Sequence, residues 1–257
     1  MAHDCDKLVA ANSSKRADPR AGSHTIEPRD QHRRRDASDS TGQTADGHAW
    51  REAQNNNRAS SIDFMLSTLI ELQRLKRLDR TGWTLRGLPN GTESVAAHSF
   101  GVSVTAMLLA DRCKARGVSL DVEKVLRIAL LHDWAETRVG DMPRTATLYF
   151  GSAARKQAET AAFADIVNAV DADGSYATLY NDYERRESTE ARLVKAADVL
   201  DLLIQVLALE RAGARGLDEF WEVADNPEFN LEGAAEQIVL ELLQSILKAR
   251  SELHPNV

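Results

Sequence analysis

The sequence lacks three features that mark secreted and membrane proteins. Its two cysteines, Cys5 and Cys113, lie far apart and do not form the disulfide framework of a small secreted domain. Residues 1–16 contain no apolar stretch typical of a secretory signal. No apolar run approaches the ~18 residues that a membrane-spanning helix needs. We therefore expect a cytoplasmic protein with no membrane partner.

An excess of basic charge is also lacking, because 39 Asp and Glu outnumber 32 Lys and Arg and give the 257 residues a net charge of -7. Nucleic-acid phosphates bind to a basic face, so we expect no nucleic-acid partner. The sequence has no Gly-rich loop followed by Lys and Ser or Thr, which excludes a P-loop nucleoside triphosphatase. The segment "AHSFG" is not the nucleophile elbow of the serine hydrolases. The chemistry of this chain must therefore rest on other groups.

Large apolar residues are almost absent from the first part of the chain. Residues 1–58 are rich in Asp, Arg, Ser, Asn, Gln and Gly. A segment of this composition cannot bury enough apolar surface to offset the entropy lost on folding. We predict a disordered polar tail over 1–58, followed by one folded domain over 59–257. A hydrophobic content of 43% for the whole chain is enough to close the core of that domain.

Beyond residue 60, apolar residues recur at helical spacing almost throughout, and no alternating strand pattern extends over more than a few residues. This periodicity predicts an all-α domain. Ser94 is a helix-capping type and Gly117 is a helix breaker, and either Ser119 or Asp121 could begin the next helix. A loop is expected over 79–93. The predicted helices span residues 62–78, 94–117, 121–140, 152–170, 179–209 and 231–250.

Histidines are also rare in the predicted domain. Four of the seven lie in the tail, and His254 lies at the C-terminal end. The two that remain, His98 and His132, both lie in apolar helical segments. In "IALLHDWAET", Asp133 follows His132 directly, and Glu136 lies one helical turn further. Ionisable side chains in a core-facing segment cost several kcal/mol unless other groups satisfy them.

One divalent ion would satisfy these groups together. His132 and Asp133 diverge by ~100° around the helix, so both can touch an ion above the groove between them. His98 from the preceding helix and Asp198 from "KAADVLDLL" would bring the set to two nitrogens and two oxygens. Such mixed donors suit Mn, Co, Fe, Ni or Zn. Asp201 lies on the same helical face as Asp198, and spacing alone does not separate the two acids.

A purely structural explanation is the alternative. Each histidine could be a hydrogen-bonded core residue, and Asp198 could pair with Lys195, which lies three residues before it. That explanation must hold for both histidines and for the interior acids at the same time. We therefore favour a metal site.

The segments "RLKRLDRTGWTLRG", "TESVAAHSF", "ALLHDWAETRVGDMP" and "LVKAADVLD" resemble the HD-domain metal-dependent phosphohydrolases, in their 5′-deoxynucleotidase-like branch. The resemblance covers residues 66–209. It implies an HD-domain helical bundle, one divalent ion (Mn, Co, another transition metal or Mg) and a homodimer. It also implies a phosphoric monoester hydrolase that removes the 5′-phosphate of nucleoside monophosphates through a metal-activated water, with deoxyribonucleotides favoured.

The resemblance also implies a ligand set, which favours Asp198 over Asp201. The implied ligands are His98, His132, Asp133 and Asp198. In one respect this chain departs from the family, whose members commonly have an acid just before the first ligand histidine. Ala97 stands there instead, so we expect a hydrogen bond around the ligands to be missing. Losing such a bond weakens metal binding ~10–100-fold.

Further roles are implied by the same resemblance. Glu136 would be the acid/base residue, and Asp141 would face the sugar 3′-hydroxyl and the reaction centre. Trp83 would stack near the sugar and help to exclude a 2′-hydroxyl. Either Arg80 or Arg86 would hold the phosphate. An anionic substrate in an acidic site needs such a positive partner in addition to the ion.

Two other functions stay open. The first is an HD-domain phosphohydrolase for another nucleotide phosphate ester, such as a triphosphate or a modified nucleotide. The second is a nucleotide-binding regulator that keeps the metal site without turnover. Because a binding protein needs no proton relay, the presence of Glu136 and Asp141 favours an enzyme.

Overall fold

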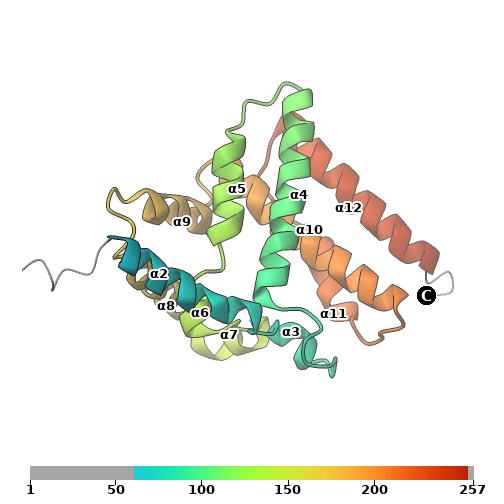
Figure 1. The fold of residues 1–257 in the computed structure, drawn as a ribbon. Coiled ribbons are helices and arrows are strands. Elements are labelled where there is room, and N and C mark those ends of the chain that lie inside the picture. Colours follow the sequence, from blue (N-terminus) through green and yellow to red (C-terminus); the bar gives the residue numbers. More distant parts are fainter. Residues whose placement is uncertain (1–60, 254–257) are drawn as a thin grey trace, which may run out of the picture. The chain divides into compact units, whose positions relative to one another are not determined.

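The computed structural model describes residues 61–253 of the chain. The chain divides into two units, residues 1–52 and 53–257, and every described residue belongs to the second. The predicted tail over 1–58 and His254 lie outside the described residues, so the domain boundary stays a prediction. Within 61–253 every regular element is a helix (Figure 1), and Asp79 and Ser94 form an isolated bridge rather than a strand pair. This confirms the predicted all-α fold.

None of the helices within 61–253 is long and apolar enough to cross a membrane. In chain order, the helices are α2 (Ser61–Leu72), η1 (Gln73–Lys76), α3 (Thr81–Thr84), α4 (Val95–Ala115), α5 (Val122–Leu131), α6 (Glu136–Val139), α7 (Arg144–Phe150), α8 (Ser152–Val167), α9 (Ser175–Arg185), α10 (Thr189–Arg211), α11 (Asp218–Trp221), η2 (Glu222–Ala224) and α12 (Gly233–Leu253).

Three helices form the centre of the core. α4, α5 and α10 all pack against one another, and Figure 1 shows α5 and α12 on opposite sides of α4. On α10, Leu193, Leu200, Leu203 and Val206 are fully buried. Burying each of these side chains contributes about 1.5–3 kcal/mol relative to exposing it. This packing fixes the relative positions of α4, α5 and α10, on which the predicted ligands lie.

Each of these three helices begins at a side-chain cap. Ser94 Oγ accepts a hydrogen bond from the Ala97 backbone N–H at 3.2 Å at the start of α4. Asp121 Oδ1 accepts from Lys124 N–H at 3.1 Å before α5, and Ser188 Oγ caps α10 in the same way. Such caps contribute about 1 kcal/mol each. The predicted starts at Ser94 and Asp121 are confirmed.

The predicted helix over 121–140 is wrong, because α5 ends at Leu131 and α6 begins only at Glu136. In a continuous helix the Ala129 carbonyl would accept from the backbone N–H of Asp133. Here the His132 side chain takes that carbonyl, with Nδ1 at 2.8 Å from the Ala129 oxygen. The chain therefore turns at His132, and the Glu136 N–H bonds the nearer carbonyl of Asp133 at 3.1 Å.

The predicted helix over 179–209 is also two helices. α9 ends at Arg185, and Arg186 adopts the left-handed backbone conformation with φ of 55°. The carboxylate of Asp182 then accepts from the backbone N–H of Ser188 at 2.9 Å and from its hydroxyl at 2.6 Å. These bonds close the turn between α9 and α10. A single acid in a polar segment is a weak signal for a helix break, and periodicity alone did not reveal it.

Smaller differences lie before α4. The predicted helix over 62–78 is α2 followed by the tighter η1. Of the apolar residues at helical spacing in this segment only Leu75 is buried in the described structure, and the others are Phe64, Leu66, Leu69, Ile70 and Leu72. α2 lies on the surface, where Thr68 Oγ1 donates to the Ile166 carbonyl at 3.5 Å and Arg138 donates to Glu71 at 2.7 Å. The expected loop over 79–93 contains the short helix α3.

Candidate metal centre

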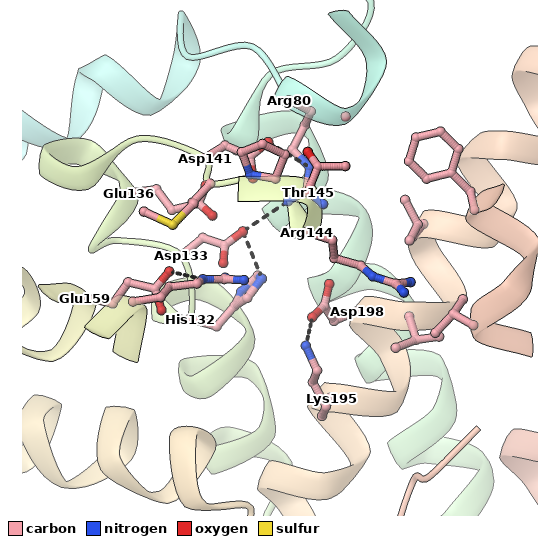
Figure 2. Close-up of a pocket in the computed structure, with 18 of the residues that line it drawn as sticks. Arg80, His132, Asp133, Glu136, Asp141, Arg144, Thr145, Glu159, Lys195 and Asp198 are labelled. Carbon is pink, nitrogen blue, oxygen red and sulfur yellow. Dashed lines mark hydrogen bonds and ion pairs between the residues drawn. The ribbon is translucent and has the colours of Figure 1, made fainter. Parts of the chain in front are cut away.

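The four residues predicted as ligands meet where α4, α5 and α10 pack together. His98 comes from α4, His132 and Asp133 follow the end of α5, and Asp198 comes from α10. His98 Nε2 lies 3.1 Å from Asp198 Oδ1 and 3.8 Å from Asp133 Oδ2. His132 Nε2 lies 3.2 Å from Asp133 Oδ2. Figure 2 shows His132, Asp133 and Asp198 at one end of a cavity.

The two imidazoles fit a metal ion. Neither Nε2 atom has a hydrogen-bond partner among the described residues, although both are buried. Both Nδ1 atoms are engaged, that of His98 with Asp201 Oδ2 at 2.9 Å and that of His132 with the Ala129 carbonyl at 2.8 Å. Metal-binding histidines commonly bond their second ring nitrogen in this way. A buried polar atom without a partner costs about 1–3 kcal/mol. A divalent ion would provide the missing partner for both.

The two acids that spacing could not separate lie at opposite edges of the His98 ring. Asp198 faces Nε2 and Asp201 faces Nδ1. The expected pair between Lys195 and Asp198 is present too, with Nζ 2.7 Å from Oδ2. Tyr183 donates to the same oxygen at 3.1 Å. Lys195 and Tyr183 therefore both contact Oδ2 of Asp198. The other oxygen, Oδ1, stays directed at Nε2 of His98.

The centre is strongly polarised. Burial and the charge of Arg80 both oppose a charge on His98, but the carboxylates of Asp198 and Asp201 outweigh them and raise the pKa of His98 to about 9. Burial acts against ionised carboxylates, yet His132, His98 and Arg80 hold the pKa of Asp133 well below its usual range. Lys195 and His98 do the same to the pKa of Asp198. A metal ion would displace a proton from His98 on binding.

The Ala97 position does not leave His98 short of a hydrogen bond. Ala97 is exposed, and the Nδ1 atom of His98 already has its partner in Asp201. The expectation of a missing bond around this histidine is therefore wrong. The carboxylate that contacts Nδ1 of His98 belongs to Asp201 of α10, rather than to the residue just before His98 on α4.

The two candidate phosphate-binding arginines lie in different surroundings. Arg80 Nη1 is 3.5 Å from Asp133 Oδ2, and its Nε is 4.0 Å from Asp141 Oδ2. Burial alone would lower the pKa of Arg80, but these two acids raise it well above its usual range. Arg86 instead pairs with Glu219 of α11. Of the two arginines, Arg80 is the one beside the candidate ligands.

Asp141 and Trp83 are both held by the loop before α4. Asp141 Oδ2 accepts from the backbone N–H of Thr81 at 2.6 Å. The Trp83 indole N–H donates to Glu93 at 2.7 Å, and its ring lies 4.7 Å from that of Phe220. Both residues line the cavity, although Trp83 is only 2% exposed. Its ring is therefore rigid and presents little surface.

Glu136 lines the same cavity and is 4% exposed. Its Oε2 atom has no hydrogen-bond partner within residues 61–253. Burial, together with the negative charges of Asp133 and Asp141, raises the pKa of Glu136 to about 10. This shift favours the protonated carboxyl group, which can act as a proton donor.

The cavity has a volume of about 740 Å³, within the size range of small-molecule sites. Its wall includes Arg144 of α7, Arg155 and Glu159 of α8, and Tyr183 of α9, none of which was predicted from the sequence. No sequence motif marks these residues, since α8 comes near the ligands by packing against α6 and α9, and α9 by packing against α5. Leu148, Phe220 and Phe229 add an apolar part.

Comparison with known proteins gives consistent matches. A family model described as "HD domain" matches residues 72–226. The 5′-deoxynucleotidase HDDC2 of Danio rerio is 32% identical over 195 residues, covering 74% of this chain and 90% of that protein. The 5′-deoxynucleotidase YGK1 of Saccharomyces cerevisiae is 30% identical, covering 62% and 73%. A solved structure of a conserved hypothetical protein from Pyrococcus furiosus is 35% identical with a TM-score of 0.62, covering 71% of this chain and 99% of that one.

Proposed function

Because the chain belongs to the HD-domain family, we propose that it is a metal-dependent phosphohydrolase that removes the 5′-phosphate of nucleoside monophosphates, with deoxyribonucleotides as the favoured substrates. One observation carries the proposal. Two buried Nε2 atoms without hydrogen-bond partners among the described residues lie beside two carboxylates, and His132, Asp133 and Asp198 line the cavity. The relatives named 5′-deoxynucleotidase support the choice of substrate.

The residues that would hold one divalent ion are His98, His132, Asp133 and Asp198. When bound, such an ion lowers the pKa of water and offsets negative charge on phosphate oxygens. Two imidazole nitrogens and two carboxylates suit Mn, Co or another transition metal, and carboxylates also suit Mg. The identity of the ion is therefore part of the test.

Arg80 is the proposed phosphate-binding side chain. Its guanidinium lies between Asp133 and Asp141, so it is held beside the candidate ligands before substrate enters. Guanidinium–phosphate pairs are charge-assisted and frequently bidentate, which gives them strength and orientation. Arg86 already pairs with Glu219, which makes it the weaker candidate.

Glu136 is the proposed proton donor to the leaving 5′-oxygen. A carboxyl group with a pKa raised to about 10 carries the proton that the leaving alkoxide needs. Asp141 is proposed to accept a hydrogen bond from the sugar 3′-hydroxyl. Trp83, held by Glu93 and Phe220, is proposed as a rigid wall that leaves no room for a 2′-hydroxyl.

The test is phosphate release from deoxy- and ribonucleoside 5′-monophosphates. The protein is stripped with chelator and reloaded with Mn²⁺, Co²⁺ or Mg²⁺, and His132→Ala and Glu136→Ala are assayed beside it. We expect metal-dependent turnover that prefers the deoxy forms and is lost in both variants. Nucleoside triphosphates and modified nucleotides complete the panel.

Two results would contradict the proposal. Turnover confined to triphosphates or modified nucleotides would keep the reaction type but overturn the substrate. Tight metal binding with no turnover on any phosphate ester would indicate a nucleotide-binding regulator instead.

The assembly is proposed to be a homodimer. Phe100, Met107 and Leu108 are 71%, 37% and 60% exposed and lie seven and eight residues apart on one face of α4. An exposed apolar stripe of this kind is typical of a protein–protein contact. Light scattering on wild type and Phe100→Asp tests it, with Tyr149→Asp on α7 as the control, since Tyr149 is 89% exposed. A monomeric wild type would contradict it. The cytoplasmic location stays a prediction.

A further inference from the structure

A glycine in the middle of α4 has no backbone reason to be there. Gly101 lies three residues after His98 in a helix of 21 residues. Glycine disfavours a helix interior relative to alanine because it loses more conformational freedom on folding. The residue is not among the glycines with positive φ, so the helix does not need its flexibility. Its role must come from the space that its missing side chain leaves.

That space is occupied by the carboxylate of Asp201, which reaches across from α10. A Cβ atom on residue 101 would lie 2.8 Å from Asp201 Cγ and 2.9 Å from Asp201 Oδ2. These distances are shorter than any ordinary contact between such atoms. The Oδ2 atom is also the one that lies 2.9 Å from His98 Nδ1. A larger residue at position 101 would therefore push Asp201 away from the histidine.

We infer that Asp201 is a positioning residue for the metal centre, and that Gly101 provides the gap through which it reaches His98. An ionised carboxylate only accepts hydrogen bonds, so His98 must donate from Nδ1. With its Nε2 proton displaced by an ion, the ring would present the lone pair of Nε2 toward Asp133 and Asp198. This inference rests on the proposed metal centre, but it assigns a role to two residues that would not themselves contact the ion.

The surroundings of Asp201 indicate that it orients His98 rather than forming part of a second ion site. One oxygen each from Glu93 and Asp201, together with a ring nitrogen of His98, lie within 4.8 Å of one another, which by spacing alone would suit a metal. However, Glu93 Oε2 accepts the indole N–H of Trp83 at 2.7 Å, and Asp201 Oδ2 contacts His98. One oxygen of each acid and the Nδ1 atom of His98 therefore already have partners on the protein. The carboxylate of Asp201 is therefore committed to orienting the ring.

The test measures Co²⁺ affinity from the visible absorption of the bound ion, in the full-length protein without substrate. We expect Asp201→Ala to weaken Co²⁺ binding ~10–100-fold, as loss of a ligand-orienting bond does. Asp201→Asn can still accept from Nδ1, so it should lose less affinity and keep the wild-type absorption spectrum. Gly101→Ala should weaken binding to a similar extent as Asp201→Ala.

The double variant Gly101→Ala/Asp201→Ala is the decisive arm. With no carboxylate to displace, the added methyl group should change nothing, so the double variant should bind Co²⁺ as Asp201→Ala does. Such non-additivity is the signature of two residues acting through one contact. Ser103→Ala is the matched control, because Ser103 lies two residues along α4 and its hydroxyl bonds only the Ser99 carbonyl of its own helix, at 2.8 Å. It should bind Co²⁺ as wild type does.

Each negative result leads to a different conclusion. A wild type that binds Co²⁺ and an Asp201→Ala variant that binds it equally tightly would overturn this inference and leave the proposed function standing. Additive losses from Gly101→Ala and Asp201→Ala would also overturn it. A wild type that binds no Co²⁺ would overturn the metal centre together with this inference. Should Gly101→Ala fail to fold, Asp201→Ala and Asp201→Asn still decide the role of Asp201.

Discussion

The two sides of the His98 ring carry similar groups, but they differ in whether those groups have hydrogen-bond partners on the protein. On the Nε2 side lie His132, Asp133 and Asp198, and on the Nδ1 side lie Glu93 and Asp201. The Nδ1 side is closed, because Asp201 bonds the ring and Glu93 bonds Trp83. On the other side, the buried Nε2 atoms of both histidines have no hydrogen-bond partner among the residues described.

This difference separates a binding site from its support. Counting acids and histidines within reach of one another would nominate both sides as metal sites. The absence of protein partners on the Nε2 atoms, within 61–253, marks the side on which a ligand is needed. Satisfied groups stabilise a conformation, while unsatisfied buried groups indicate what else the site binds.

The largest expected effect is on the Nε2 side. Replacing His132 with Ala removes one of the two unpartnered nitrogens, so metal binding should be lost and turnover should fall to background. Metal content after dialysis and phosphate release measure the two effects. Leu130→Ala is the control, because Leu130 lies two residues earlier on α5 and is 56% exposed. Normal metal content in the His132 variant would break the distinction between the two sides.

Glu136→Gln should come next, with kcat reduced ~10²–10⁴-fold, as the loss of a general acid does. The amide keeps the shape of the side chain but cannot deliver a proton. Metal affinity should stay close to that of wild type, because Glu136 is not one of the proposed ligands. Single-turnover kinetics and a metal titration separate these outcomes. A fall in metal affinity as large as that of His132→Ala would instead make Glu136 a ligand.

The arginines give a smaller contrast within the same cavity. Arg80→Ala should lower kcat/KM ~10–100-fold, since hydrogen bonds to charged groups contribute about 1.5–3 kcal/mol. Arg86→Ala should lower it ~5-fold at most, because it breaks a partly exposed pair with Glu219. Steady-state kinetics on one deoxynucleoside monophosphate compares them. Equal losses would mean that Arg86 leaves Glu219 to bind substrate.

The smallest effect on deoxynucleotide turnover is expected on the Nδ1 side, where the main loss should be in stability and where a smaller wall at Trp83 should admit ribonucleotides more readily. Trp83→Phe removes the indole N–H from Glu93 while keeping an aromatic ring against Phe220. Leaving the carboxylate oxygen without its donor should lower the free energy of unfolding by about 1–3 kcal/mol. Urea denaturation measures it, with Trp134→Phe as a matched control elsewhere. Metal affinity should be unchanged, and a large loss of it would place Trp83 in the support of the ligands.

Much of the fold could be predicted because its signals are local. The starts of α4 and α5 follow from Ser94 and Asp121, whose side chains cap the nearest free N–H groups. The all-α class follows from periodicity over many residues. The candidate ligand residues could be predicted because ionisable groups are scarce in apolar helices, and His98 and His132 stood out among few histidines.

What could not be predicted depends on contacts across the chain. The end of α5 depends on the His132 side chain taking the Ala129 carbonyl, which no propensity describes. Asp198 and Asp201 share a helical face, and only the position of the His98 ring shows which nitrogen each one meets. Tyr183 and Glu159 belong to α9 and α8, so their place in the cavity required the packing of those helices.

The candidate ligands come from the ends and interiors of three helices that also form the hydrophobic core. A bound ion would therefore also affect the stability of the fold. An ion bound by α4, α10 and the end of α5 would act as a cross-link between the helices, present only in the folded chain. By mass action, a metal at a hundred times its dissociation constant adds about 2.7 kcal/mol to the stability of the folded state. The supply of metal in the cell would then govern how long the protein survives as well as how fast it works.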